Sequence, residues 1–86
     1  MHEITFSKQA DKTLRKMPRN LALTISKKIK KLALDPHAHG MRNVKKLTNH
    51  PGYRLRVGDW RIVYTVHDSE LIVHVVKIKT RGEVYK

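Results

Sequence analysis

The sequence contains no cysteine, which excludes disulfides, cysteine-ligated zinc and thiol catalysis. Its longest apolar run falls far short of the roughly 20 residues that a membrane-spanning helix needs. The first residues lack a charged segment followed by an apolar stretch, so we expect no signal peptide. No glycine-rich loop precedes a predicted helix, which excludes the common phosphate loops of nucleotide enzymes. These absences favour a cytoplasmic protein with no membrane partner.

Acidic residues are also scarce: seven Asp and Glu stand against 19 Lys and Arg, a net charge of +12 on 86 residues. No two carboxylates have the spacing of an acid–base pair. The six histidines lack the spacing of metal ligands, so we expect no metal or cofactor. The length indicates a single domain, residues 1–86. Its charge favours a polyanionic partner: nucleic acid, an anionic membrane surface or an acidic protein.

The most informative stretch is residues 53–64, which alternates as two strands joined by Gly58 and Asp59. Glycine in the first loop position suits a type II′ turn, whose twist matches that of the strands. This turn predicts the register of the hairpin, with Arg56 directly opposite Arg61. Like charges in that position destabilise a sheet. A sequence that retains them, with Arg54 two residues away, predicts an anion bound on this face. The alternative is an ordinary solvated sheet face, on which the arginines are exposed strand residues.

The other face of the hairpin is apolar. It carries Tyr53, Leu55, Val57, Trp60, Ile62 and Tyr64. We expect Trp60 and Tyr64 to lie in the core, where apolar faces pack, instead of stacking on a base. His74 is expected on the arginine face near Val63, as a packed histidine, with contact to substrate as the alternative.

The remaining pattern predicts an α+β fold of order β-α-α-β-β-β. A short strand covers residues 2–6, and Ser7 is a suitable N-cap for a helix that ends before Pro18. A second helix follows up to Asp35, and the two should form a hairpin. Residues 37–52 are expected to be irregular. The apolar residues 71–78 indicate an interior strand covered on both sides. We expect an antiparallel sheet with the two-helix hairpin on its apolar face.

With these residues in view, the chain resembles the RelE/ParE superfamily of bacterial type II toxins. The resemblance rests on residues 53–64 and on the ending Arg81-Gly82-Glu83-Val84-Tyr85, and the order of elements agrees with it. It implies the RelE-like microbial RNase fold. It also implies a toxin encoded beside an antitoxin, which cleaves mRNA in the ribosomal A site through attack by the 2′-oxygen. The antitoxin would wrap an acidic or partly disordered segment around the basic face in a hetero-oligomeric complex.

The resemblance also implies which residues act. The family's basic hairpin positions fall on Arg54 and Arg56, and its central arginine falls on Arg61. The terminal motif supplies Arg81, with Lys79 as a possible substitute, and Tyr85. Further contacts to mRNA and ribosomal RNA are expected from Lys27, Lys31, Lys45, Lys46, His50 and Lys79. Arg54 and Arg56 are unsuited to act as a general base, because a guanidinium effectively never loses its proton. Tyr85, His50 or water would have to serve as the base instead.

Two alternatives remain open at this stage. ParE-like members of the superfamily inhibit DNA gyrase without catalysis, and the chain is compatible with such a binding module. A basic RNA- or antitoxin-binding relative that has lost activity is the third possibility. The joint presence of Arg61, Arg81 and Tyr85 favours the nuclease, because a pure binder has no need of that set.

Overall fold

The computed structural model describes residues 2–35, 43–48 and 51–80. Its elements are β1 (Glu3–Phe6), α1 (Lys8–Lys16), α2 (Arg19–Leu34), β2 (Val44–Lys46), β3 (Tyr53–Val57), β4 (Trp60–His67), a 3₁₀ turn (Asp68–Glu70) and β5 (Ile72–Thr80). The α+β class is confirmed. One element was not predicted: β2 lies in the stretch expected to be irregular. No helix in the described ranges is long and apolar enough to cross a membrane.

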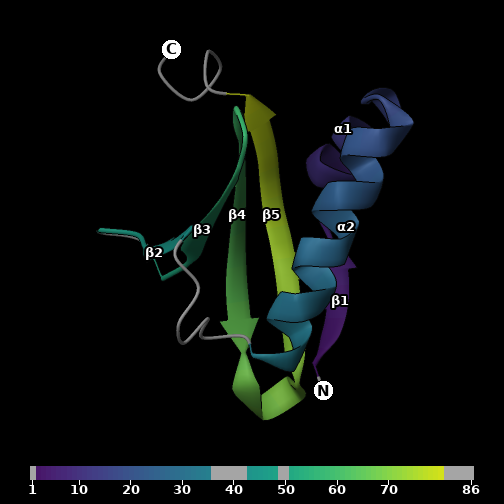
Figure 1. The fold of residues 1–86 in the computed structure, drawn as a ribbon. Coiled ribbons are helices and arrows are strands. Elements are labelled where there is room, and N and C mark those ends of the chain that lie inside the picture. The colour runs from purple at the N-terminus through teal and green to yellow at the C-terminus, as the bar shows by residue number, and fades with distance from the viewer. Residues whose placement is uncertain (1, 36–42, 49–50, 81–86) are drawn as a thin grey trace.

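The strands form one sheet in the order β1-β5-β4-β3-β2. Strands β2 to β5 pair antiparallel, as predicted. β1, however, pairs parallel with β5, so the sheet is mixed and the antiparallel prediction holds for the meander but not for β1. The reason is topological: β1 leads into the helices, and the meander returns to its side only with β5, which runs in the same direction. Figure 1 shows this arrangement, with β2 and β3 curling away from the helices.

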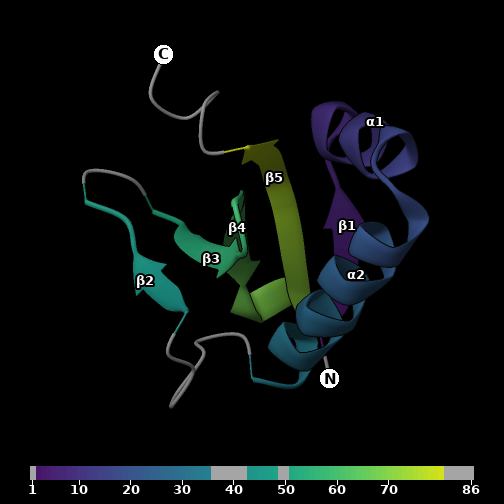
Figure 2. The ribbon, with the colours of Figure 1, turned by 45° about the horizontal axis from the view of Figure 1, so that its top comes forward.

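The two helices cover one face of the sheet. Ser7 caps α1, because its hydroxyl oxygen accepts a hydrogen bond from the Ala10 N–H at 3.1 Å. Pro18 separates the helices and serves as the N-cap of α2. α1 packs mainly against β5, and α2 packs against β1 and β5. Each helix therefore contacts the sheet more than it contacts the other helix (Figure 2).

The core forms between the helices and the apolar face of the strands. Its larger fully buried side chains are Ile25, Ile29, Leu32, Leu55, Ile62, Tyr64, Val73, Val75 and Ile78. This confirms the core position of Tyr64, whereas Trp60 is only partly buried at the edge of the cluster. β5 is interior to the sheet as predicted, but it is not covered on both sides, because Ile72, His74 and Val76 are only partly buried.

The predicted hairpin register is confirmed, including the Arg56–Arg61 pair. Gly58 has a φ of +58°, a left-handed value that the first position of a type II′ turn requires and that glycine adopts without strain. Between β4 and β5 the register shifts, because Val63 faces Lys77 while Tyr64 faces Val75. Because of this β-bulge, the residues of β5 that follow it lie on the opposite side of the sheet from the one that strict alternation would give them.

Side chains from the start of α1 hold this part of β5. The Ser7 hydroxyl donates to the carbonyl of Val76, the extra residue of the bulge. The Gln9 amide pairs with the Ile78 backbone in both directions, donating to its carbonyl oxygen and accepting from its N–H at 3.0 Å each. Gln9 thereby takes the place of a neighbouring strand where β1 has ended. Nothing in the sequence pattern pointed to this contact.

Replacing Tyr64 with phenylalanine is expected to raise the free energy of unfolding by about 1 kcal/mol, because the buried Tyr64 hydroxyl has no hydrogen-bond partner. Burial, and secondarily the neighbouring Tyr53, raises the pKa of the Tyr64 phenol. The folded state thus favours the neutral phenol, while the unfolded chain ionises from about pH 10. This contribution is complete below pH 10 and is lost as the pH rises further. Urea unfolding between pH 7 and 11 tests this, and an equal alkaline loss in Tyr64→Phe would contradict it.

Candidate anion-binding face

The sheet face opposite the helices, called here the open face, carries two rows of cations. In the first row Arg56, Arg61 and Lys79 are direct neighbours across β3, β4 and β5. In the second row Lys45, Arg54, Val63 and Lys77 follow one another from β2 to β5. The bulge at Val76 is what turns Lys77 and Lys79 to this face while Val75 and Ile78 both stay in the core.

Arg61 is the unusual member of the first row. Its side chain lies between cationic neighbours in the middle of the sheet, and the residue is only 7% exposed. Its Nε and Nη1 atoms are buried without a hydrogen-bond partner, and so is Nε of Arg54. A buried guanidinium left unpaired costs several kcal/mol unless an anion satisfies it. The pattern therefore indicates a site that is complete only with a bound anion.

No carboxylate in the described ranges neutralises these rows. The ion pairs found there lie elsewhere: His2 with Asp68 at 3.0 Å, and Arg15 with Asp11 at 3.1 Å along α1. Charges of one sign confined to one face raise the local concentration of oppositely charged ligands and speed their association. The open face is thus suited to phosphate or carboxylate groups from outside the chain.

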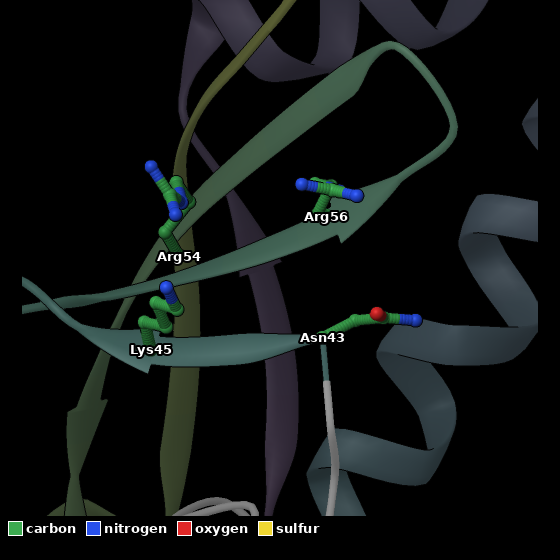
Figure 3. Close-up of a pocket in the computed structure, with 4 residues that line it drawn as sticks. All are labelled: Asn43, Lys45, Arg54 and Arg56. Atoms are coloured by element: carbon green, nitrogen blue, oxygen red, sulfur yellow. The ribbon is translucent and has the colours of Figure 1, made fainter.

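A pocket of about 160 Å³ opens at one end of the face. Figure 3 shows Lys45 beside Arg54, with Arg56 further along β3 and Asn43 just before β2. The backbone N–H of Arg56 donates to the Asn43 carbonyl oxygen at 2.9 Å, which extends the pairing of β2 and β3. Three of the four lining side chains carry fixed donors only, and guanidinium groups bind phosphate oxygens in pairs.

The candidate residues fall into three groups. Arg54, Arg56, Arg61, Lys45 and Lys79 share the open face. Lys46 lies opposite Tyr53 on the other side of β2, and Lys27 and Lys31 are exposed on α2, in the layer behind the sheet. His50, Arg81 and Tyr85 fall outside the described residues.

His74 lies on the open face, as expected, and is half-buried. It pairs with Thr65 of β4 and with Thr5 of β1, and its Nδ1 lies 2.7 Å from the Thr5 hydroxyl oxygen. This contact depends on the parallel pairing of β1, which the sequence did not predict. The ring is therefore held by a neighbouring strand and is not enclosed in the core.

Two residues of the face escaped the sequence reasoning. Lys77 was assigned to a strand apolar on both faces, although the alternation Lys77-Ile78-Lys79 is a signal that both lysines share a side. Asn43 was placed in an irregular stretch, and only the pairing of β2 with β3 brings it to the pocket. A local pattern carries no information about such a long-range pairing.

These features define a class: a small, strongly basic α+β domain with unpaired cations on one sheet face. Similarities to known proteins support this description. Residues 4–85 match the family model described as the ParE toxin of type II toxin–antitoxin systems, parDE. The chain belongs to this family of ParE/RelE toxins. It is accordingly the toxin of a RelBE/ParDE-type toxin–antitoxin system.

Individual relatives support the same family. An Escherichia coli protein described as a RelE-like toxin is 29% identical over 98% of this chain and 90% of its own length. The archaeal RelE–RelB complex from Pyrococcus horikoshii matches with a TM-score of 0.81 and 26% identity, covering 94% of this chain and 96% of the other. A doubly substituted E. coli RelE bound to an antitoxin RelBc peptide matches with a TM-score of 0.77 and 27% identity, covering 98% and 90%.

Proposed function

We propose that this toxin is a ribosome-dependent mRNA endonuclease, which acts in the cytoplasm and stops translation. The observation that carries the proposal is Arg61, a guanidinium almost wholly buried, unpaired, and set among further cations that make no ion pair with any described carboxylate. Such a group stabilises the extra negative charge that develops when a phosphate is attacked. A face that bound RNA only loosely would need exposed cations, not a buried one.

RNA carries its own nucleophile, so the reaction requires little from the protein. The 2′-oxygen attacks the adjacent phosphorus, the bond from phosphorus to the 5′-oxygen breaks, and a cyclic phosphate and a 5′-hydroxyl result. Arg61, together with Arg81, would hold the scissile phosphate, while Arg54 and Arg56 bind the flanking phosphates. Tyr85 would stack on a base or take part in proton transfer. None of these roles calls for a metal ion.

The partner that controls the toxin is an antitoxin protein. Structures of relatives of this chain have been solved in complex with RelB antitoxins, and the unneutralised cations of the open face fit an acidic antitoxin segment. We propose that such a segment wraps the toxin in a hetero-oligomeric complex. The lysines of α2, Lys27 and Lys31, lie behind the sheet and would meet ribosomal RNA instead of the cleaved strand.

The decisive experiment maps the 5′ ends of translated and untranslated messages after induction of the toxin. We expect new 5′ ends at positions in frame with the codons, only on messages that are being translated. A matched control message with its start codon removed should remain intact. Cleavage independent of translation, or intact mRNA in growth-arrested cells, would contradict the proposal.

A second candidate is favoured by one observation, because the matching family model is named for ParE. In the superfamily, ParE-like members inhibit DNA gyrase as binding modules. For this chain that function predicts intact mRNA together with gyrase-linked DNA breaks after induction. The same 5′-end experiment, run with an assay for DNA damage, separates the two functions. If induction causes neither mRNA cleavage nor DNA breaks and leaves growth unchanged, the chain would be an inactive relative.

A further inference from the structure

The proposed cleavage needs a group that removes the proton from the attacking 2′-hydroxyl. The arginines of the open face do not supply it, because a guanidinium effectively never loses its proton. We propose that His74 is the general base of this reaction, an inference that rests on the proposed nuclease function. Histidine is suited to the role because its charge changes between pH 5 and 8.

The register of the sheet places His74 beside the cation rows. In the second row Val63 lies between Arg54 and Lys77, and it is the one apolar side chain in that row. Thr65, the cross-strand partner of His74, lies two residues further along β4. Val63 and His74 are therefore diagonal neighbours on adjacent strands, and such neighbours have Cα atoms about 7–8 Å apart. Arg61 lies two residues before Val63 on the same face of β4. The scissile phosphate held by Arg61 would therefore extend over Val63, with the imidazole at its side.

The imidazole ring is positioned for this task. Its Nδ1 is held by the Thr5 hydroxyl at 2.7 Å, which fixes the orientation of the ring. Within residues 2–35, 43–48 and 51–80, no hydrogen-bond partner occupies its Nε2. The other histidine on this face, His67, differs because its Nε2 is engaged with the Thr65 hydroxyl at 2.9 Å. His74 is thus the described histidine of the open face with a ring nitrogen available.

The step balances as a simple proton transfer. In the tautomer it requires, Nδ1–H donates to the Thr5 oxygen and Nε2 is unprotonated. Nε2 of His74 takes the proton of the 2′-hydroxyl as the oxygen–phosphorus bond forms. The bond to the 5′-oxygen breaks, that oxygen takes a proton from water, and the imidazolium returns its proton to the solvent. No oxidant or further reactant is consumed.

Other ionisable groups share the face with His74. Those nearest to it in the register are Glu3 on β1, His67 on β4, Lys77 on its own strand and, two strands away, Arg54. Further along the face lie Lys45, Arg56, Arg61 and Lys79. A change in activity with pH must be separated from the titration of these groups. His67 provides the matched control, since it lies on the same face but its Nε2 is already engaged.

The test measures cleavage of a translated message by purified toxin and ribosomes between pH 5.5 and 8. The wild-type rate should rise with pH, and His74→Ala should lose about 100-fold or more in rate together with that rise. Added imidazole should restore part of the cleavage rate of His74→Ala. Thr5→Val should lower the wild-type rate, but by less than His74→Ala does. His67→Ala should retain both rate and pH profile.

The outcomes separate the two proposals. A wild-type toxin that leaves every message intact overturns the nuclease function and the role of His74 with it. An active wild-type toxin whose His74→Ala variant keeps the same rate and pH profile overturns His74 alone. If His74→Ala does not fold, as judged by thermal melting, His74→Gln takes its place, because it keeps the volume and a polar contact to Thr5 but cannot accept a proton at neutral pH.

Discussion

Replacing Arg61 with methionine is expected to abolish toxicity and at the same time to stabilise the fold. Toxicity depends on charge stabilisation at the phosphate, and loss of one such donor typically lowers the rate by about 10²–10³-fold. The free energy of unfolding should rise by about 1 kcal/mol, because the substitution removes the buried Nε and Nη1 atoms, which have no hydrogen-bond partner to offset their desolvation. Methionine retains most of the length of the side chain and therefore its packing. Growth after induction and thermal unfolding measure the two effects on one variant.

Arg19→Met is the matched control, because Arg19 is exposed at the start of α2, behind the sheet. It should keep full toxicity and an unchanged melting temperature. Inorganic phosphate provides a second check: it should raise the melting temperature of the wild type by binding only the folded state, and Arg61→Met should lose most of this shift. A folded, fully toxic Arg61→Met would refute the assignment of Arg61.

The affinity for single-stranded RNA is expected to fall steeply with salt. The open face presents six basic side chains: Lys45, Arg54, Arg56, Arg61, Lys77 and Lys79. Each phosphate neutralised contributes about −0.7 to the slope of log K against log salt. Six contacts therefore predict a slope of about −4, which is about a 300-fold loss of affinity between 50 and 200 mM salt. Fluorescence anisotropy with a short 2′-O-methyl RNA, which resists cleavage, measures the slope.

Two double variants test where the charges act. Lys77→Gln with Lys79→Gln should reduce the magnitude of the slope by about 1.4, since two phosphate contacts are lost. Lys27→Gln with Lys31→Gln removes the same charge from α2 and should leave the slope for a short oligonucleotide unchanged. Equal slopes for both double variants would mean that binding follows net charge alone and not the open face.

The local pattern predicted much of the fold. The alternation in residues 53–64 and the Gly58-Asp59 turn were sufficient for the hairpin register, because side chains alternate strictly along a strand and a two-residue loop allows little slip. Ser7 and Pro18 likewise located the ends of the helices. β2 was missed because three residues carry too little periodicity to distinguish a strand from a loop.

The site was predicted in part for the same reason. Arg54, Arg56 and Arg61 were placed together because they belong to one hairpin, where sequence distance and spatial distance are closely tied. Lys77 was missed because a bulge shifts the register of β5 by one residue, and a bulge leaves no reliable mark on hydrophobic periodicity. Lys45 was assigned to RNA from its charge alone, whereas its position opposite Arg54 comes from the pairing of β2.

By itself, the sequence was sufficient to predict a polyanionic partner for this protein. The excess of Lys and Arg over Asp and Glu and the opposition of Arg56 and Arg61 are local properties, independent of the rest of the fold. Only the tertiary structure decided that Arg61 is buried without a partner and that His74 is held by Thr5. Both depend on strands brought together from distant parts of the chain, where burial and pairing are set by packing and by the parallel return of β5 beside β1.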